Sequence, residues 1–254
     1  MAESEFKLDG KVAIVTGASR GIGEAIARGL AKHGATVVIC SRKQDGLDAV
    51  AASIASDGGK AVAIACHTGQ MSAIDALFER VKAEFGRVDI LVNNAATNPY
   101  FGPMVEISEG AYDKTFEVNV KGYFFMAQKA ARFMVEQGSG SIINIASIAG
   151  ISAPPMQGIY GVTKSSVIAM TRAFAKELGG ANVRVNAVCP GLVETKFAQV
   201  LIDSPEMYEH FVSKTPMGRH AQPSEMVGAV LYLASDLASY TTGAVLVCDG
   251  GYTS

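Results

Sequence analysis

Short runs of apolar residues alternate with longer amphipathic stretches along the whole chain of 254 residues. Apolar runs rich in β-branched residues predict strands at 11–16, 35–40, 60–65, 88–93, 141–146, 183–188 and 244–249. Between them, apolar positions at helical spacing predict helices near 21–33, 43–57, 71–85, 108–136, 157–178 and 223–234. Most strand runs are continuously apolar, as expected where helices cover both faces of a parallel sheet.

This alternation, with its short connections, implies right-handed crossovers and a doubly wound sheet. The sequence therefore predicts an α/β protein with a single-domain Rossmann fold, in which helices flank a seven-stranded parallel sheet. No linker or internal repeat divides the chain, so we expect one domain over residues 1–254. Residues 94–107 and 189–222 interrupt this alternation of strands and helices. Both segments follow strand ends, where open α/β sheets bind ligands. We expect the substrate loop at about 189–222.

Composition narrows the class of partner. Apolar residues make up 49% of the chain, and a net charge of −2 provides no basic field for nucleic acid or an anionic membrane. No apolar run approaches the ~18 residues of a membrane span. The polar, acidic first ten residues are unlike a leader, and we expect a cytoplasmic protein. The four cysteines stand singly, which predicts buried free thiols, and the four histidines lack ligand spacing, so no metal site is expected.

The segment TGASRGIG, residues 16–23, lies between the first predicted strand and the first predicted helix. Its glycines permit a tight turn and a close approach of the backbone to a ligand. The helix start then offers N–H groups and the positive end of its dipole to a pyrophosphate. Such a turn alone could be only a tight turn, but in this position it predicts dinucleotide binding. The expected contacts are Gly17, Ser19, Arg20, Gly21 and Ile22.

The end of the second predicted strand indicates which dinucleotide is bound. An acid there would bind the ribose hydroxyls of NAD and repel the 2′-phosphate of NADP. This chain has Ser41, Arg42 and Lys43 there, and no acid before Asp45. A guanidinium matches a phosphate, and a serine hydroxyl can donate to it. Arg42 and Lys43 could instead form a solvated helix start, but we favour NADP(H), held by Ser41 and Arg42.

With these residues in place, the whole chain resembles the short-chain dehydrogenase/reductase family. From residue 10 to the C-terminal DGG, further motifs occur in the family's order and spacing: NNAA (93–96), Asn119 in VNV, Ser147 in IASIAG, YGVTK (160–164) and CPGLVET (189–195). The chain looks closest to the NADPH-dependent carbonyl and retinal reductases, followed by the 3-oxoacyl-carrier-protein reductases. The resemblance implies hydride transfer between NADP(H) and a ketone, aldehyde or secondary alcohol.

The family's chemistry assigns roles to four residues, Asn119, Ser147, Tyr160 and Lys164. Tyr160 would be the acid and base, and Lys164, four residues later, lies on the same face if the segment is helical. One charge about 4 Å away supplies ~4 kcal/mol at an effective dielectric near 20, which would bring a phenol pKa from ~10 toward ~7. Ser147 would donate to the substrate oxygen, and Asn119 would hold a water that links Lys164 to solvent.

The resemblance also implies further cofactor contacts. Tyr160 and Lys164 would lie at the nicotinamide ribose, and the remaining contacts would come from Asn93, Ala95, Pro190, Gly191, Val193 and Thr195. His67 stands where the family often has an acid that bonds the adenine, so adenine recognition differs here. The resemblance also implies a homotetramer. Surplus apolar residues on two long helical segments favour pairing with another subunit: Phe124, Phe125, Phe133, Val167, Met170 and Phe174.

Several alternatives remain open from the sequence. Taken alone, Tyr160 and Lys164 could be surface residues, Ser147 a helix cap and Asn119 a polar helix residue. A dinucleotide-binding protein without catalysis is one alternative, and a 3-oxoacyl-thioester reductase is another. A serine hydrolase is disfavoured, because the chain has no G-x-S-x-G elbow. The substrate site is expected to be apolar, although its residues could equally be core or interface: Pro99, Tyr100, Phe101, Pro154, Met156, Phe197, Met207 and Phe211.

Overall fold

A parallel sheet of seven strands forms the centre of the computed structural model, which describes residues 6–254. The strands are β1 (Val12–Thr16), β2 (Thr36–Ser41), β3 (Lys60–Ala65), β4 (Ile90–Asn93), β5 (Gly140–Ile145), β6 (Val183–Pro190) and β7 (Val245–Cys248). They are ordered β3-β2-β1-β4-β5-β6-β7, so the chain reverses its direction of winding between β1 and β4. The predicted Rossmann fold is confirmed. The first five residues, part of the segment expected not to be a leader, lie outside the described residues.

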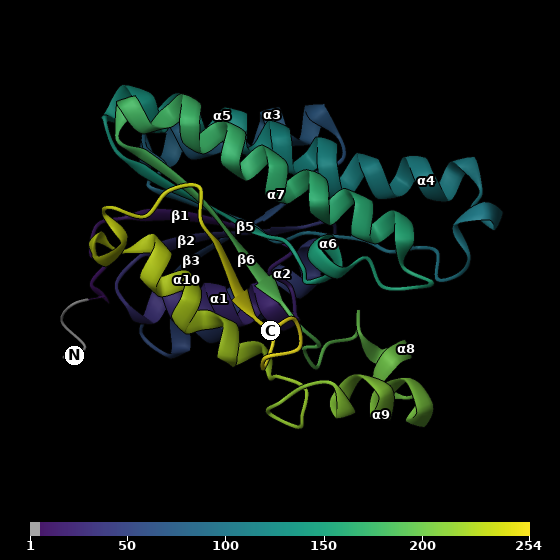
Figure 1. The fold of residues 1–254 in the computed structure, drawn as a ribbon. Coiled ribbons are helices and arrows are strands. Elements are labelled where there is room, and N and C mark those ends of the chain that lie inside the picture. The colour runs from purple at the N-terminus through teal and green to yellow at the C-terminus, as the bar shows by residue number, and fades with distance from the viewer. Residues whose placement is uncertain (1–5) are drawn as a thin grey trace.

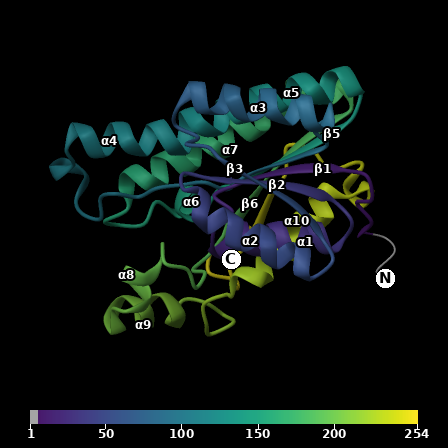
Figure 2. The same cartoon turned by 180° about the vertical axis from the view of Figure 1, so that it is seen from behind.

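Helices cover both faces of this sheet (Figures 1 and 2). One face carries α1 (Gly21–Lys32), α2 (Gln44–Ser56) and α10 (Val227–Ala234). The other face carries α3 (Met71–Phe85), α5 (Tyr123–Gln137) and α7 (Gly158–Leu178), and α4 (Glu109–Phe116) extends this layer beyond the sheet. The short helix α6 (Ala149–Ser152) follows β5, and α8 (Gln199–Ile202) and α9 (Pro205–Ser213) follow β6. Helices α8 and α9 project from the body, and we refer to residues 199–213 as the lid.

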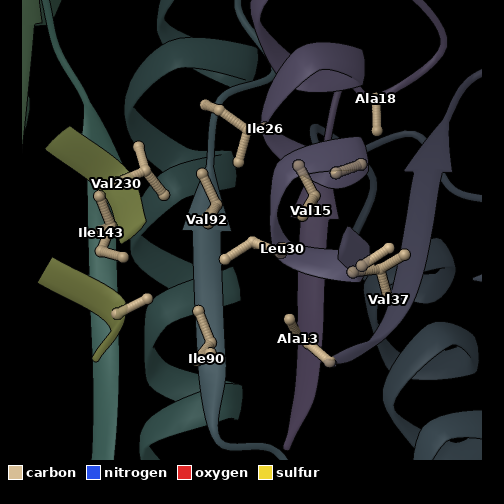
Figure 3. Close-up of a cluster of buried hydrophobic side chains, with 14 of the residues drawn as sticks. Ala13, Val15, Ala18, Ile26, Leu30, Val37, Ile90, Val92, Ile143 and Val230 are labelled. Atoms are coloured by element: carbon tan, nitrogen blue, oxygen red, sulfur yellow. The ribbon is translucent and has the colours of Figure 1, made fainter. Parts of the chain in front are cut away.

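Both faces of the sheet are apolar because each packs against a helical layer. Figure 3 shows Val15, Val92 and Ile143 on the face toward α1 and α10, in contact with a cluster that includes Leu30 and Val230. Side chains at alternate positions of the same strands belong to a second cluster with α3 and α5. Each fully buried aliphatic side chain contributes ~1.5–3 kcal/mol relative to exposure. Two packed faces explain why the strand runs are continuous rather than alternating.

The long helical segment expected at 108–136 is interrupted in its middle. Between α4 and α5, residues Glu117–Gly122 form a π-helical turn. Single π turns inside helices often mark functional sites. Asn119 lies in this turn and is 0% exposed. The spacing of apolar residues did not predict this interruption, because a turn that is wider by one residue barely changes the spacing.

The cysteines and histidines of the described residues do not gather into a possible metal site. Cys40, Cys66 and Cys189 are buried free thiols, whereas Cys248 is only partly buried on the edge strand β7. Within residues 6–254, no group of three or more His, Cys, Asp or Glu side chains could hold a metal ion. None of the helices in the same range is long and apolar enough to cross a membrane.

Candidate active site

The predicted glycine-rich cradle lies between β1 and α1. Gly17 has φ of 66°, and a Cβ added there would lie 2.9 Å from the Cα of Ala95. A Cβ on Gly23 would lie 2.5 Å from the Gly17 carbonyl oxygen, closer than real Cβ atoms come. Helix α1 begins at Gly21, and among the described residues no side chain caps its N-terminus. These first N–H groups fit a pyrophosphate, so the cradle suits a dinucleotide.

Asn94 and Thr16 hold this cradle against the end of β4. The Thr16 hydroxyl oxygen accepts from the backbone N–H groups of Asn94 and Ala95, at 2.8 and 2.9 Å. The Asn94 side-chain amide donates to the Thr16 carbonyl at 2.9 Å and to the Gly17 carbonyl at 3.3 Å. Neither side chain was predicted as part of the site. The sequence held a signal for both, since Thr16 ends β1 and Asn94 directly follows β4, and these buried strands are neighbours in the sheet.

Asn93, predicted to support the cofactor site, has a side chain that faces the core. Its side chain is 1% exposed and donates to the Tyr123 carbonyl at 3.2 Å and to Asn144 Oδ1 at 3.0 Å. Asn144 in turn donates to Thr171 Oγ1 at 2.9 Å. Successive strand residues point to opposite faces, so Asn93 joins β4 to β5 and α5 while Asn94 faces the cradle. The side-chain contact with the cradle therefore belongs to Asn94.

Basic side chains gather at the ends of β2 and β3. Ser41 is the last residue of β2, and Arg42 and His67 lie beyond the strand ends. His67 Nδ1 accepts from the Gly69 N–H at 3.0 Å, and its Nε2 lies 3.1 Å from Lys114 Nζ. Burial and the charges of Lys114 and Arg42 lower the pKa of His67. The His67 imidazole is therefore biased toward its neutral form beside two cations.

Lys164 is the most deeply enclosed charged group of the site. It lies on α7 with 1% exposure, and its Nζ donates to the Ile145 carbonyl at 2.7 Å and to Tyr123 Oη at 3.2 Å. Burial lowers the pKa of Lys164 to about 7. Tyr123 was not predicted, although it lies one helical turn after Asn119. Its own hydroxyl donates to Ile145, so it fixes the end of β5 and the lysine together.

Tyr160 and Lys164 lie together on one face of α7, as the four-residue spacing predicts. Lys164 Nζ is 5.7 Å from the centroid of the Tyr160 ring, and the tyrosine is 8% exposed. Burial raises the pKa of Tyr160, and the Ser147 hydroxyl acts in the opposite direction. The raised pKa of Tyr160 differs from the lowered pKa that the charge of Lys164 was expected to produce. The reason is that burial disfavours both the phenolate and the ammonium.

Asn119 and Ser147 complete the group of four predicted catalytic residues. The Asn119 side chain accepts from the Thr97 N–H at 2.8 Å and donates to the Thr97 carbonyl at 2.8 Å. It also donates to Thr163 Oγ1 on α7 at 3.1 Å, which joins three segments at the π turn. Ser147 follows β5, and its Oγ accepts from the Ala149 N–H at 3.1 Å. Ser147 thus accepts from the first residue of α6, whose N-cap position is Ile148.

The segment after β6 reaches both the cradle and the tyrosine. At the end of β6, Gly191 leaves no room for a Cβ, which would lie 2.9 Å from the Asp249 Cα. Val193 pairs with Ala221 in a β-bridge. Thr195 lies against the cradle, because a Cβ on Gly21 would be 3.2 Å from its Cγ2.

Three of the residues predicted to form an apolar substrate site show different surroundings. The ring centroids of Phe197 and Tyr160 are 5.5 Å apart. Phe211 stacks on Tyr252 at 4.4 Å, so it packs the lid against the C-terminal segment. Met156 has φ of 65°, rare for a residue with a side chain, and its carbonyl accepts from the Gly102 N–H at 2.9 Å. That bond ties the loop before α7 to the segment 94–107.

We expect Lys164→Met to stabilise the protein in the absence of cofactor. Burial lowers the lysine pKa from 10.5 to about 7, so between these values the unfolded chain binds the proton more tightly. This cost to the folded state is on the order of 5 kcal/mol below pH 7, falls as the pH rises from 7 to 10.5, and is absent above pH 10.5. Loss of the hydrogen bonds to Ile145 and Tyr123 offsets part of the gain.

Thermal unfolding of both proteins at pH 6 and pH 10 measures this effect. The variant should exceed the wild type at pH 6 by a wider margin than at pH 10. A difference that does not change with pH would show that Lys164 carries no burial cost.

Comparisons with known proteins agree with this geometry. A family model described as enoyl-(acyl carrier protein) reductase matches residues 17–253. The Bos taurus dehydrogenase/reductase SDR family member 4 is 39% identical over 247 residues, covering 97% of this chain and 88% of that protein. A 3-oxoacyl-acyl-carrier-protein reductase of Thermotoga maritima is 38% identical over 246 residues, covering 97% and 99%. The crystal structure of a gluconate 5-dehydrogenase from Burkholderia cenocepacia, in complex with NADP and tartrate, has a TM-score of 0.96 at 33% identity and covers 100% of this chain and 99% of that one. The chain belongs to the short-chain dehydrogenase/reductase family.

Proposed function

We propose that this oxidoreductase transfers a hydride between NADP(H) and a carbonyl or secondary alcohol, acting as a ketone or aldehyde reductase. The observation that carries the proposal is the buried pair of Tyr160 and Lys164 beside a dinucleotide cradle. Both side chains are almost fully enclosed, which is costly for ionisable groups without a task. Relatives that include carrier-protein and gluconate enzymes support the reaction class.

The proton of the reaction is assigned to Tyr160. NADP(H), when bound, supplies or accepts the hydride and, when oxidised, adds a positive charge to the site. The Tyr160 hydroxyl donates its proton to the substrate oxygen during reduction, and Ser147 donates a hydrogen bond to the same oxygen. Because burial raises the pKa of the phenol, Tyr160 keeps its proton until charge develops on the substrate.

Lys164 then stabilises the phenolate that remains. Its Nζ is fixed by the Ile145 carbonyl and Tyr123, and its pKa of about 7 allows it to gain or lose a proton near neutral pH. Asn119 clamps Thr97 and Thr163 beside this lysine, which suits the proposed role of holding a water on a path to solvent. Tyr160 and Lys164 lie on α7, and Ser147 lies two residues after β5, so rigid elements of the fold position all three.

NADP(H) is proposed as the cofactor because positively charged side chains lie near the end of β2. Arg42 and Lys114 both lower the pKa of His67 through their charges, so each lies near that imidazole, and Lys114 also pairs with Glu117. Ser41 ends β2 without a neighbouring acid. In this arrangement Arg42 and Ser41 would hold the 2′-phosphate, and His67, which follows β3, would lie at the adenine. The pyrophosphate is assigned to Ser19, Arg20, Gly21 and Ile22, and the nicotinamide to Pro190, Gly191, Val193 and Thr195.

Cofactor oxidation with a panel of ketones and aldehydes tests the function. We expect NADPH-dependent reduction of at least one small or bulky apolar ketone. A purified protein that binds NADPH but turns over no carbonyl compound would instead be a dinucleotide-binding protein without catalysis.

A 3-oxoacyl-thioester reductase is the second candidate. It is supported by the 38% sequence identity with the Thermotoga maritima enzyme over nearly the whole of both chains. Adding an acetoacetyl thioester, on carrier protein and on coenzyme A, to the same panel separates the two. The thioester would have to be reduced with a higher kcat/KM than every free ketone for this candidate to be preferred.

The homotetramer is also proposed, through a face formed by α5 and α7. Phe124, Val135, Met170 and Phe174 line a groove of about 530 Å³ there, and Phe124 is 39% exposed. Of the other residues predicted for this contact, Val167 is 0% exposed and Phe133 packs on Phe78 within the core. A second contact could form at the edge strand β7, which offers unpaired backbone groups.

Light scattering should give four times the 26.5 kDa mass of one chain. Phe124→Glu should lower the mass, because it places a charge in the groove. Val105→Glu, at a residue that is 93% exposed on another segment, is the control and should leave the mass unchanged. A wild-type monomer at micromolar concentration would contradict the proposal.

A further inference from the structure

Three side chains outside the catalytic group form a linear hydrogen-bonded chain. Tyr208 Oη lies 2.8 Å from His220 Nδ1, and His220 Nε2 lies 3.2 Å from Glu194 Oε2. The ring centroids of Tyr208 and His220 are 5.6 Å apart. We refer to Tyr208, His220 and Glu194 together as the latch. The chemistry proposed above uses none of these residues.

The donors and acceptors of the latch match along its length. A carboxylate only accepts, so the His220 nitrogen facing Glu194 carries the proton. In the neutral imidazole the other nitrogen then accepts from the Tyr208 hydroxyl. The Gln222 side chain also donates to Glu194, and these two hydrogen bonds lower the pKa of that carboxyl. Glu194 is therefore held as a carboxylate that favours this orientation of the imidazole.

The surroundings fix His220 from the side of its own loop. Arg219 donates to the His220 carbonyl at 3.0 Å and forms a bidentate ion pair with Glu225, with both distances 2.7 Å. Glu225 also accepts from the Gln222 N–H at 2.8 Å. The charged and polar groups that face the latch are thus Arg219, Glu225 and Gln222. These contacts hold the loop that carries His220 in place.

The latch joins two parts of the molecule that matter for ligand binding. Tyr208 lies on α9 of the lid, whereas Glu194 lies between Val193 and Thr195. The backbone of this second segment pairs with the His220 loop, since the Glu194 N–H donates to the Ala221 carbonyl at 2.8 Å. Thr195 touches the cradle, and Phe197 lies beside Tyr160. A displacement of α9 therefore acts on the segment that borders both the proposed nicotinamide site and the catalytic tyrosine.

We infer that His220 is a positioning residue that ties the lid helix α9 to the segment 193–197 and so sets the position of Thr195 at the cradle and of Phe197 beside Tyr160. His220 acts through Tyr208 and Glu194 rather than as a member of the proposed catalytic group. The kinetic part of its test rests on the proposed function, whereas the exchange part does not.

Hydrogen–deuterium exchange of the protein without substrate is the first test. Tyr208→Phe removes the hydroxyl and keeps the ring, and it should speed exchange of residues 199–213 by about 3–10-fold, as expected for the loss of one hydrogen bond. Tyr252→Phe is the matched control, because Tyr252 stacks on Phe211 of the same helix through its ring. Equal exchange in wild type and Tyr208→Phe would overturn the inference, whether or not the protein is a reductase.

Steady-state kinetics with a carbonyl substrate is the second test. Tyr208→Phe and Glu194→Ala should each raise the substrate KM by about 3–10-fold, the effect of one hydrogen bond, and leave kcat within about twofold. Glu194→Gln keeps an oxygen that accepts from His220, so it should restore most of the loss. The double variant Tyr208→Phe/Glu194→Ala should be no worse than the poorer single variant, since both act through His220. Effects that multiply in the double variant would show two independent contacts and contradict the latch.

Discussion

Tyr160→Phe should lower turnover by at least ~10²-fold and leave the dissociation constant for NADPH nearly unchanged. General acid catalysis contributes about that factor or more, and phenylalanine keeps the ring without the proton. The ring is 8% exposed and lies 5.5 Å from Phe197, so the substitution preserves packing while removing one hydroxyl. Turnover is measured with the best ketone of the panel, and NADPH binding is measured separately by fluorescence titration.

Tyr112→Phe is the control for removing a phenol elsewhere. Tyr112 is 43% exposed and stacks on Phe116 at 4.6 Å, away from the group of four. Its activity should match wild type. If Tyr160→Phe also retains wild-type turnover, the catalytic assignment of Tyr160 is wrong. If the variant loses NADPH binding as well, Tyr160 acts mainly through the cofactor site, and its role as the acid is unsupported.

The fold followed from the sequence because its signals are local and repeated. Each predicted strand is a short apolar run, and each run pairs with the neighbour that the Rossmann order requires. The cradle was predictable for a similar reason, since only glycine allows the approach of Gly17 to Ala95. Tyr160 and Lys164 share one helix face through simple helical periodicity. Backbone geometry carries all of these features, and sequence spacing reports it directly.

The sequence could not predict the features that depend on which way a side chain faces and on the groups that surround it. Asn93 and Asn94 are adjacent and identical in type, yet one bonds inside the core and the other holds the cradle. The phenol pKa was expected to fall because charge was considered without burial, and burial has the opposite sign. Glu194, Tyr208 and His220 all lie in the predicted substrate loop, but their spacing follows no helical or strand period, so no local pattern predicts their hydrogen bonds.

Cofactor choice produces the second large effect, and Arg42→Ala is its test. Arg42 is exposed just beyond β2, where it and Lys114 lower the pKa of His67 through their charges. A guanidinium meets a phosphate with two parallel charge-assisted hydrogen bonds, and Ser41 can add a third. A partly exposed contact of this kind contributes roughly 1.5–3 kcal/mol, or about 10–150-fold in affinity.

We therefore expect Arg42→Ala to raise the KM for NADPH by about 10–150-fold and to leave the KM for NADH nearly unchanged. The 2′-phosphate is the one group that distinguishes the two cofactors, so only an interaction with that group separates their constants. Lys43→Ala is the matched control, because it removes the same charge from the next exposed residue. If the control has the same effect, the cause is the general field rather than a directed contact. Wild-type preference for NADH, or an equal loss with both cofactors, would leave Arg42 as a solvated helix start and refute NADP(H) as the cofactor.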